Sequence, residues 1–306
     1  MRPLIAILLG LTLPLFAATK SQTTTKLDEQ IRAAEAAFQR GDAEGAVRTA
    51  NTAVKDHPDS IRPLVIRSQL FTAMKQYTLA IKDLTQAIKL QPSVPDLFQA
   101  RGEAHFRNVD MSAAITDWDE TIRLRPAQEP HHWQRGIAYY YAGQYAKGRR
   151  QFIIHQTVNA ADVENAVFHF ICTARAIDLK TANKEFIHIK GDSRIPMFEI
   201  HRLFAGNMTV AKVLEAAGKP SVDDILARRR LTPQAKVRQQ FYANYYIGLY
   251  HESHGQAAKA RPFIMKAAKT ADSNGFMGDC ARVHATLIRQ AEAKSKAKSQ
   301  KLISIP

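Results

Sequence analysis

Histidine and acidic residues at helical spacing are the side chains in this sequence most able to do chemistry. His251 and His254 are three residues apart, so on a helix they would share one face, a spacing that can hold a metal ion. The segment reads His-Glu-Ser-His, one residue shorter than the zinc metalloprotease motif, so it does not keep that register. Glu164 and His169 form a weaker pair on an apolar helix. A structural or surface role is the favoured interpretation of these histidines.

No stronger catalytic pattern accompanies these pairs. The sequence has no nucleophile elbow, phosphate-binding loop or dinucleotide fingerprint. A helical hydrolase using His251 or His169 is therefore kept only as a second alternative, and no catalytic residue, metal ligand or cofactor is assigned. Cys172 and Cys280 lie among apolar neighbours, which favours two buried free thiols over a disulfide and leaves both open.

The elements that carry these residues follow a repeat. A constant step of 34 residues links three prolines and two series of small or short side chains: Pro58, Pro92, Pro126; Ala46, Ala80, Ala114; Ala53, Ala87, Thr121. Self-similarity at this period indicates paired helices, because small residues let two helices approach closely and proline ends the second helix. The expected turns within the pairs are Gly41-Asp42, Lys75-Gln76-Tyr77, Gly143-Gln144-Tyr145 and His254-Gly255-Gln256.

This pattern resembles the tetratricopeptide repeat family, with small residues at the eighth, twentieth and twenty-seventh places of each copy. The eighth places are Ala34, Ser68, Gly102 and Gly136. The resemblance implies an all-α superhelix of helix-turn-helix units, an α-solenoid, with an irregular helical insert. We expect one domain over 19–290 and a disordered basic tail over 291–306. The expected repeats are 27–60, 61–94, 95–128, 129–162 and 241–274, with the insert at 163–240.

The first eighteen residues have the order of a secretory signal peptide. A basic start at Met1-Arg2-Pro3 precedes an apolar stretch over 4–16, and Ala17-Ala18 precede a polar sequence. The apolar stretch is short for a membrane span, so we expect an exported mature chain without a transmembrane segment, periplasmic or secreted.

The family resemblance also implies a binding surface, because the first helix of each repeat lines the concave face of such arrays. On that basis the partner-binding residues are Arg62, Gln69, Gln99, Phe106, Trp133, Tyr140 and Tyr141. The aromatic members would anchor a protein or peptide, since Trp and Tyr combine large contact area with a polar group. The alternative is that these aromatic residues pack against the insert.

Positive charge suggests another kind of partner. The chain carries 43 Lys and Arg against 28 Asp and Glu, a net charge of +15. A basic surface could attract anionic envelope polymers or a membrane surface, although a solvated surface is the simpler interpretation. Nucleic acid is a poor partner for an exported protein. The local maxima are Arg149, Arg150, Arg228, Arg229 and Arg230.

The predicted architecture also resembles the exported bacterial envelope adaptors of the NlpI type. The likeness covers several repeats, a helical break and a closing repeat that contains Tyr-Tyr-Ile-Gly-Leu-Tyr at 245–250. No cysteine lies near the signal junction, so lipid attachment is not carried over. The sequence therefore predicts a non-enzymatic scaffold that binds a protein or peptide in the cell envelope, with the cationic polymer binder as the alternative.

Overall fold

The computed structural model describes residues 25–220, 225–228 and 230–303, and every regular element in these ranges is a helix. The predicted signal peptide over 1–18 and Arg229 lie outside the described residues. The chain divides into two compact units between Ala104 and His105, a point that lies within one helix. The predicted all-α repeat fold is confirmed.

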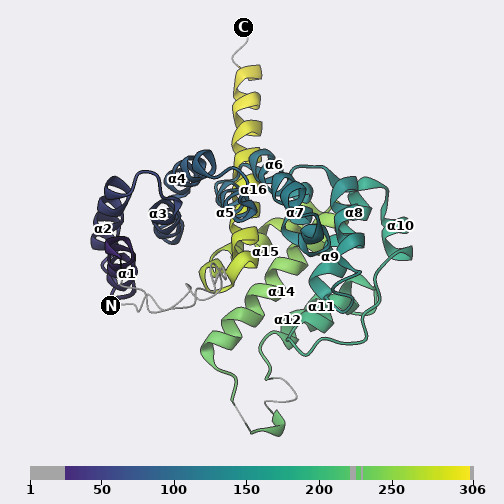
Figure 1. Ribbon diagram of the computed structural model, residues 1–306. Coiled ribbons are helices and arrows are strands. Elements are labelled where there is room, and N and C mark those ends of the chain that lie inside the picture. Colours follow the sequence, from purple (N-terminus) through teal and green to yellow (C-terminus); the bar gives the residue numbers. More distant parts are fainter. Residues whose placement is uncertain (1–24, 221–224, 229, 304–306) are drawn as a thin grey trace. The chain divides into compact units, whose positions relative to one another are not determined.

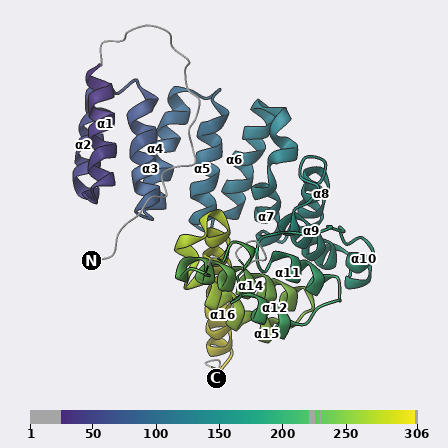
Figure 2. The ribbon, with the colours of Figure 1, turned by 90° about the horizontal axis from the view of Figure 1, so that it is seen from below.

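The N-terminal unit is built from helical hairpins. Figures 1 and 2 show α1 beside α2 and α3 beside α4, and the unit ends within α5. Small side chains form much of its core: Ala34, Ala46 and Ala50 are buried with Leu70. The helices are α1 (Lys26–Gln39), α2 (Ala43–Asp56), α3 (Ile61–Ala73), α4 (Tyr77–Leu90) and α5 (Pro95–Arg107).

The turn inside each hairpin places one residue in the left-handed region. These residues are Gly41, Lys75, Val109 and Gly143, with φ of 86°, 59°, 65° and 71°, and they follow the repeat step of 34. Glycine adopts this conformation without a steric penalty, whereas a β-branched residue is strained there. The predicted turns are therefore in place, and the stacked repeats keep the conformation even where the residue is Val109.

The C-terminal unit continues the hairpins and then adds further helices around one large core. Figure 1 shows α14 and α15 side by side, and α15 in turn packs against α16. Its described elements begin with α6 (Met111–Leu124), the 3₁₀ helix η1 (Pro126–His131), α7 (Trp133–Tyr141), α8 (Tyr145–His155) and α9 (Val163–Ala176). Next come α10 (Leu179–Lys184), α11 (Met197–Phe204), α12 (Val210–Ala216), α14 (Pro233–Ser253), α15 (Ala257–Ala268), η2 (Ala271–Ser273) and α16 (Gly275–Ile303).

Helix starts in the predicted insert follow their capping residues. Thr209 and Thr232 accept hydrogen bonds at the starts of α12 and α14, as expected of N-cap residues. The apolar helix expected to carry Glu164 and His169 is α9, and its central residues are buried on nearly every side. The helices α10 and α11 were not predicted. Ser221 followed by Asp224 in the sequence predicts a capping box, but these two residues lie outside the described residues.

Two features bear on the predicted domain organisation. Within the predicted domain over 19–290 the chain forms two compact units, because repeats contact only their neighbours while the C-terminal helices form a core of their own. The basic tail expected to be disordered from 291 is helical to Ile303 as part of α16. Its Ala, Lys and Gln residues are good helix formers, and neither Gly nor Pro interrupts them before Pro306.

Among the described residues, none of the helices is both long and apolar enough to span a bilayer.

Candidate functional site

The first-helix face of the N-terminal unit carries polar side chains. Arg62 on α3 pairs with Asp28 on α1, with Nη2 and Oδ1 2.7 Å apart. These two residues occupy the same place in consecutive repeats, so the pair shows that adjacent first helices lie side by side. Gln69 on α3 and Gln99 on α5 are half-buried, and Gln99 Nε2 donates to Glu103 Oε1 at 3.1 Å. The polar residues predicted for this face therefore lie at or near the surface.

The aromatic end of the predicted groove is not open. Phe106 is completely buried and stacks on Phe276 of α16, with ring centroids 4.9 Å apart. Trp133 meets the same ring edge-on at 5.1 Å and is only partly exposed. The last helix of the chain thus covers the aromatic residues that were expected to anchor a partner.

The two tyrosines at this end of the groove likewise form hydrogen bonds with later parts of the same chain. The Tyr140 hydroxyl donates to Glu252 Oε2 at 2.8 Å. The Tyr141 hydroxyl lies 2.6 Å from the Tyr245 hydroxyl and donates to the carbonyl of Cys280 at 3.1 Å. Burial raises the pKa of Tyr140 and of Tyr141 well above the usual range, so both stay protonated donors.

These contacts correct the expected role of four residues: Phe106, Trp133, Tyr140 and Tyr141. The alternative was packing against the insert, and α9 does contribute, since Phe168 meets Tyr140 edge-on at 6.2 Å. The main cover, however, comes from Tyr245 and Glu252 of α14 and from Phe276 of α16, which follow the insert in the chain. Apolar aromatic faces gain more from burial against these helices than from exposure to water. Substituting these aromatic residues would therefore test folding as well as binding.

An arginine series that the sequence analysis missed ties the repeats together. Arg67, Arg101 and Arg135 are 34 residues apart and stand at the same place in three copies. Arg67 binds both carboxylate oxygens of Asp83 at 2.8 and 2.6 Å and reaches Asn51 at 2.7 Å. Each guanidinium thus bonds to the second helix of the preceding repeat. The other contacts are Arg101 to Thr85, and Arg135 to Asp119 and Gln151. The signal, the step of 34, was present in the sequence.

Comparison with known proteins agrees with this architecture. Residues 67–129 match the family model for the tetratricopeptide repeat. The helical hairpins within this stretch are tetratricopeptide repeats. A solved tetratricopeptide repeat protein from Parabacteroides merdae is similar to the chain, at 13% identity and a TM-score of 0.52, covering 84% of this chain and 98% of that one. Such tetratricopeptide arrays generally serve as protein–protein interaction scaffolds.

Looser similarities extend to other solved structures. MamA from Desulfovibrio magneticus RS-1 has 18% identity and a TM-score of 0.48, covering 54% of this chain and 93% of that one. The C-terminal part of a tetratricopeptide repeat-containing protein from Cytophaga hutchinsonii has 14% identity and a TM-score of 0.44, covering 82% and 86%. At these identities a likeness concerns the fold alone.

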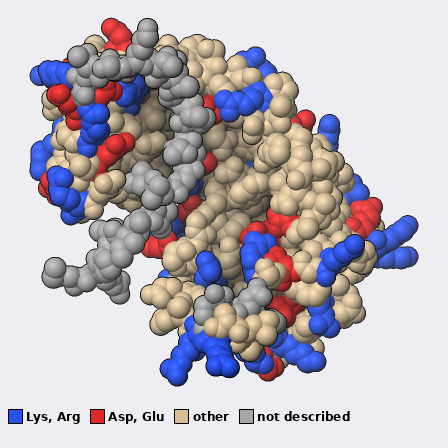
Figure 3. Space-filling view, turned by 60° about the horizontal axis from the view of Figure 1, so that its bottom comes forward, with Lys and Arg blue, Asp and Glu red and all other residues tan. Residues whose placement is uncertain are grey.

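The described members of the basic residues singled out from the sequence lie in two parts of the chain, on α8 and in the connection before α14. Arg149 is paired with Glu185, with Nη2 and Oε2 2.6 Å apart, while Arg150 is exposed. Arg228 and Arg230 are exposed in the connection before α14. On the face shown in Figure 3, Lys and Arg side chains are interspersed with Asp and Glu. This distribution gives a polymer no single cationic surface there.

The histidines considered for catalysis or metal binding are in contact with other side chains or buried in the fold. His251 Nδ1 lies 2.8 Å from Gln256 Oε1, and the ring stacks on Phe263. His169 is buried on α9, where burial and the charge of Arg149 lower its pKa to about 4. Within the described part of the chain, no three His, Cys, Asp or Glu residues lie together in a group that could hold a metal ion.

The two cysteines are buried and free, as the sequence favoured. Burial raises the pKa of the Cys172 thiol and that of the Cys280 thiol. Both therefore remain neutral thiols that pack like small apolar side chains rather than acting as nucleophiles.

Proposed function

We propose that this protein is an interaction scaffold that binds a protein or peptide partner on the first-helix face of residues 25–104. One observation carries the proposal: the aromatic end of the array is filled by α14 and α16, whereas polar first-helix side chains of the N-terminal unit lie at the surface. Glu35 is exposed, the Arg62 side chain is 49% exposed, and Gln69 and Thr72 are half-buried. A polar peptide can replace the Arg62–Asp28 pair with contacts of its own.

Substitutions on this face test the proposal. Arg62→Ala with Gln69→Ala is expected to lower partner capture at least tenfold, because both polar contacts to the partner are removed. The measurement is quantitative mass spectrometry of proteins bound by the immobilised full chain from a native extract. The matched control is Arg48→Ala with Lys55→Ala, two exposed residues on α2, the second helix of the first repeat.

The outcome that contradicts the proposal is a double variant of the first-helix face that folds and still captures the parent's partners. The salt dependence of binding distinguishes this proposal from the alternative, a cationic protein that binds anionic polymers. Binding to an anionic polymer would fall steeply as salt rises, because bound counterions are released, whereas a polar peptide complex would lose much less.

We also propose that the protein is exported into the cell envelope and acts there. The support is the order of basic, apolar and small residues over 1–18. Expression of the full chain in a bacterial host is expected to yield a periplasmic or secreted protein that begins after Ala17 or Ala18. N-terminal sequencing of the fractionated protein checks this expectation. A cytosolic product that retains residues 1–18 would argue against export.

A further inference from the structure

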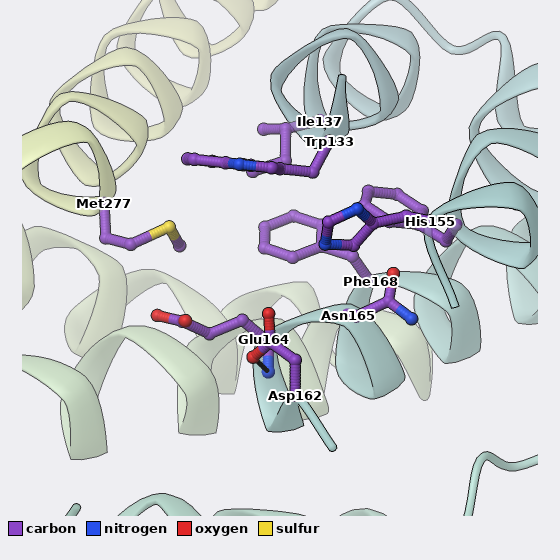
Figure 4. A pocket seen from close by; sticks show the side chains of 9 residues that line it. Trp133, Ile137, His155, Asp162, Glu164, Asn165, Phe168 and Met277 are labelled. Atoms are coloured by element: carbon purple, nitrogen blue, oxygen red, sulfur yellow. Dashed lines mark hydrogen bonds between the residues drawn. The ribbon is translucent and has the colours of Figure 1, made fainter. Parts of the chain in front are cut away.

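A small cavity in the C-terminal unit is bordered by residues of α7, α8, α9 and α16 and by the N-cap residue of α9. Its volume is about 70 Å³. Figure 4 shows Trp133 and Ile137 on one side and Asp162 and Glu164 on the other. Trp133, Asp162 and Glu164 are partly exposed, so the cavity opens to solvent beside them. The remaining lining residues are buried: Ile137, Phe152, His155, Asn165, Phe168 and Met277.

An unpartnered acceptor lies in the wall of this cavity. Gln156 Nε2 donates to the carbonyl of Ala160 at 2.9 Å, so Gln156 Oε1 must accept from Asn165 Nδ2, which lies 2.7 Å away. This orientation leaves Asn165 Oδ1 without a hydrogen-bond partner among the described residues. The residue is buried, since only 2% of the Asn165 surface is exposed. A buried oxygen of this kind is costly unless a donor reaches it.

The neighbouring ring presents a second acceptor. His155 Nδ1 lies 2.8 Å from the carbonyl of Pro130, and only a protonated Nδ1 can donate to that oxygen. In the neutral ring Nε2 therefore carries a lone pair. Figure 4 shows the Asn165 oxygen pointing toward this ring. Asn165 Nδ2 and His155 Nδ1 already donate to Gln156 and Pro130, so the atoms that these two lining residues have left, Asn165 Oδ1 and His155 Nε2, are acceptors.

The carboxylates at the cavity give it an excess of negative charge. One guanidinium, that of Arg194, lies beside three carboxylates: 2.6 Å from Asp192, 3.1 Å from Glu164 and 3.6 Å from Asp162. Asp162 oxygens are also bonded to the backbone N–H of Glu164 and to Asn159. Burial and the charge of Asp162 raise the pKa of Glu164. A cation in the cavity would offset both effects.

We propose that this cavity binds a primary ammonium group at the end of an aliphatic stem, as a lysine side chain of the partner presents it. The ammonium has three donors and no acceptor, which matches the acceptors of Asn165, His155 and Glu164. The stem would pack against Phe168 and Met277, and the face of Trp133 favours a nearby cation. This proposal adds a ligand class to the proposed scaffold function. It rests on that function only where it assigns the lysine to a protein partner.

The size of the cavity agrees with this ligand. One water needs about 10–15 Å³ of such volume, so 70 Å³ holds roughly five to seven non-hydrogen atoms. A lysine side chain has a four-carbon stem and one nitrogen, whereas the arginine side chain is longer and ends in a wide planar group.

Calorimetric titration of the full chain with lysine blocked at both its α-amino and carboxyl groups tests the site. Saturable binding is expected, and acetylation of the side-chain nitrogen should weaken it at least tenfold because it removes the charge. Glu164→Gln should also weaken binding about tenfold, since the isosteric amide lacks the negative charge. The matched control is Glu185→Gln, which removes a glutamate paired with Arg149 and outside the cavity wall. Circular dichroism establishes that each variant is folded.

A second probe, n-butylammonium, distinguishes two sources of the ammonium group, a lysine of a protein and a free amine. If the blocked lysine binds comparably, the source is a protein lysine; if only n-butylammonium binds, the site takes a free amine, and the ammonium site stands in both cases. Absence of binding by both probes to the parent, or equal binding by Glu164→Gln, would overturn the proposal. Because neither probe involves the first-helix face, failure here leaves the proposed scaffold function intact, and the reverse also holds.

Discussion

Arg67→Ala is expected to lower the free energy of unfolding by about 3–5 kcal/mol. Arg67 on α3 reaches Asn51 on α2 and Asp83 on α4, so one side chain joins three helices of the N-terminal unit. Only 4% of Asp83 is exposed. Removing the guanidinium leaves a buried carboxylate without its cation, which costs more than the lost contacts themselves. Urea unfolding followed by circular dichroism measures the change.

Two further variants show whether the buried carboxylate is the cause. Arg67→Met combined with Asp83→Leu should recover most of the lost stability, because it removes both charges and keeps apolar volume. Arg48→Ala is the surface control: Arg48 pairs with Glu44 at 3.6 Å with both side chains largely exposed, and we expect a change below about 0.5 kcal/mol. A similar small effect for Arg67→Ala would refute the structural role of the arginine series.

Lowering the pH from 7 to 4 is expected to destabilise the C-terminal unit by several kcal/mol. Burial, with the charges of Arg135 and Arg149 respectively, lowers the pKa of His132 and that of His169 to about 4. In the unfolded chain a histidine protonates near its ordinary pKa of about 6.5. Between these two values the unfolded state binds more protons, so stability falls as the pH falls, by up to about 3 kcal/mol for each histidine.

A pair of adjacent histidines allows a matched test of this pH dependence. Neither ring nitrogen of His132 has a hydrogen-bond partner among the described residues, so His132→Phe can keep the aromatic packing and remove the titration. The loss of stability per pH unit should decrease by as much as about 1.4 kcal/mol between pH 6.5 and pH 4. His131→Gln, at the exposed neighbour, should keep the parent slope.

Tryptophan fluorescence is a suitable probe, because both tryptophans, Trp118 and Trp133, belong to the C-terminal unit. An unchanged slope in the His132→Phe variant would mean that this histidine is not a source of the acid sensitivity.

Local features of the fold could be predicted because they recur within each repeat. Proline, alanine and turn residues at a step of 34 fix where hairpins begin, cross and end, and each repeat contacts mainly its neighbours. The same step would have identified Arg67, Arg101 and Arg135, had polar positions been compared as well as apolar ones. Capping residues such as Thr232 likewise act within one turn of helix.

The state of the aromatic residues could not be predicted in this way. Phe106 and Tyr140 have the residue types of a binding surface, and those types look the same whether a partner or the chain's own helices cover them. Their cover comes from Phe276 and Glu252, more than 100 residues later in the sequence. The cavity beside Trp133 also depends on such distant contacts, since Met277 lines it together with residues of α7 and α9.

The sequence by itself determined the helical repeats, their turns and their small-residue crossings, because these depend on backbone conformation and on neighbours within about 34 residues. Only the tertiary structure decided which surfaces stay open. Burial of apolar area is non-directional, so several faces could have covered Phe106 and Trp133 equally well by residue type. The packing of α14 and α16 made that choice within the C-terminal unit, and it left the small cavity beside Trp133.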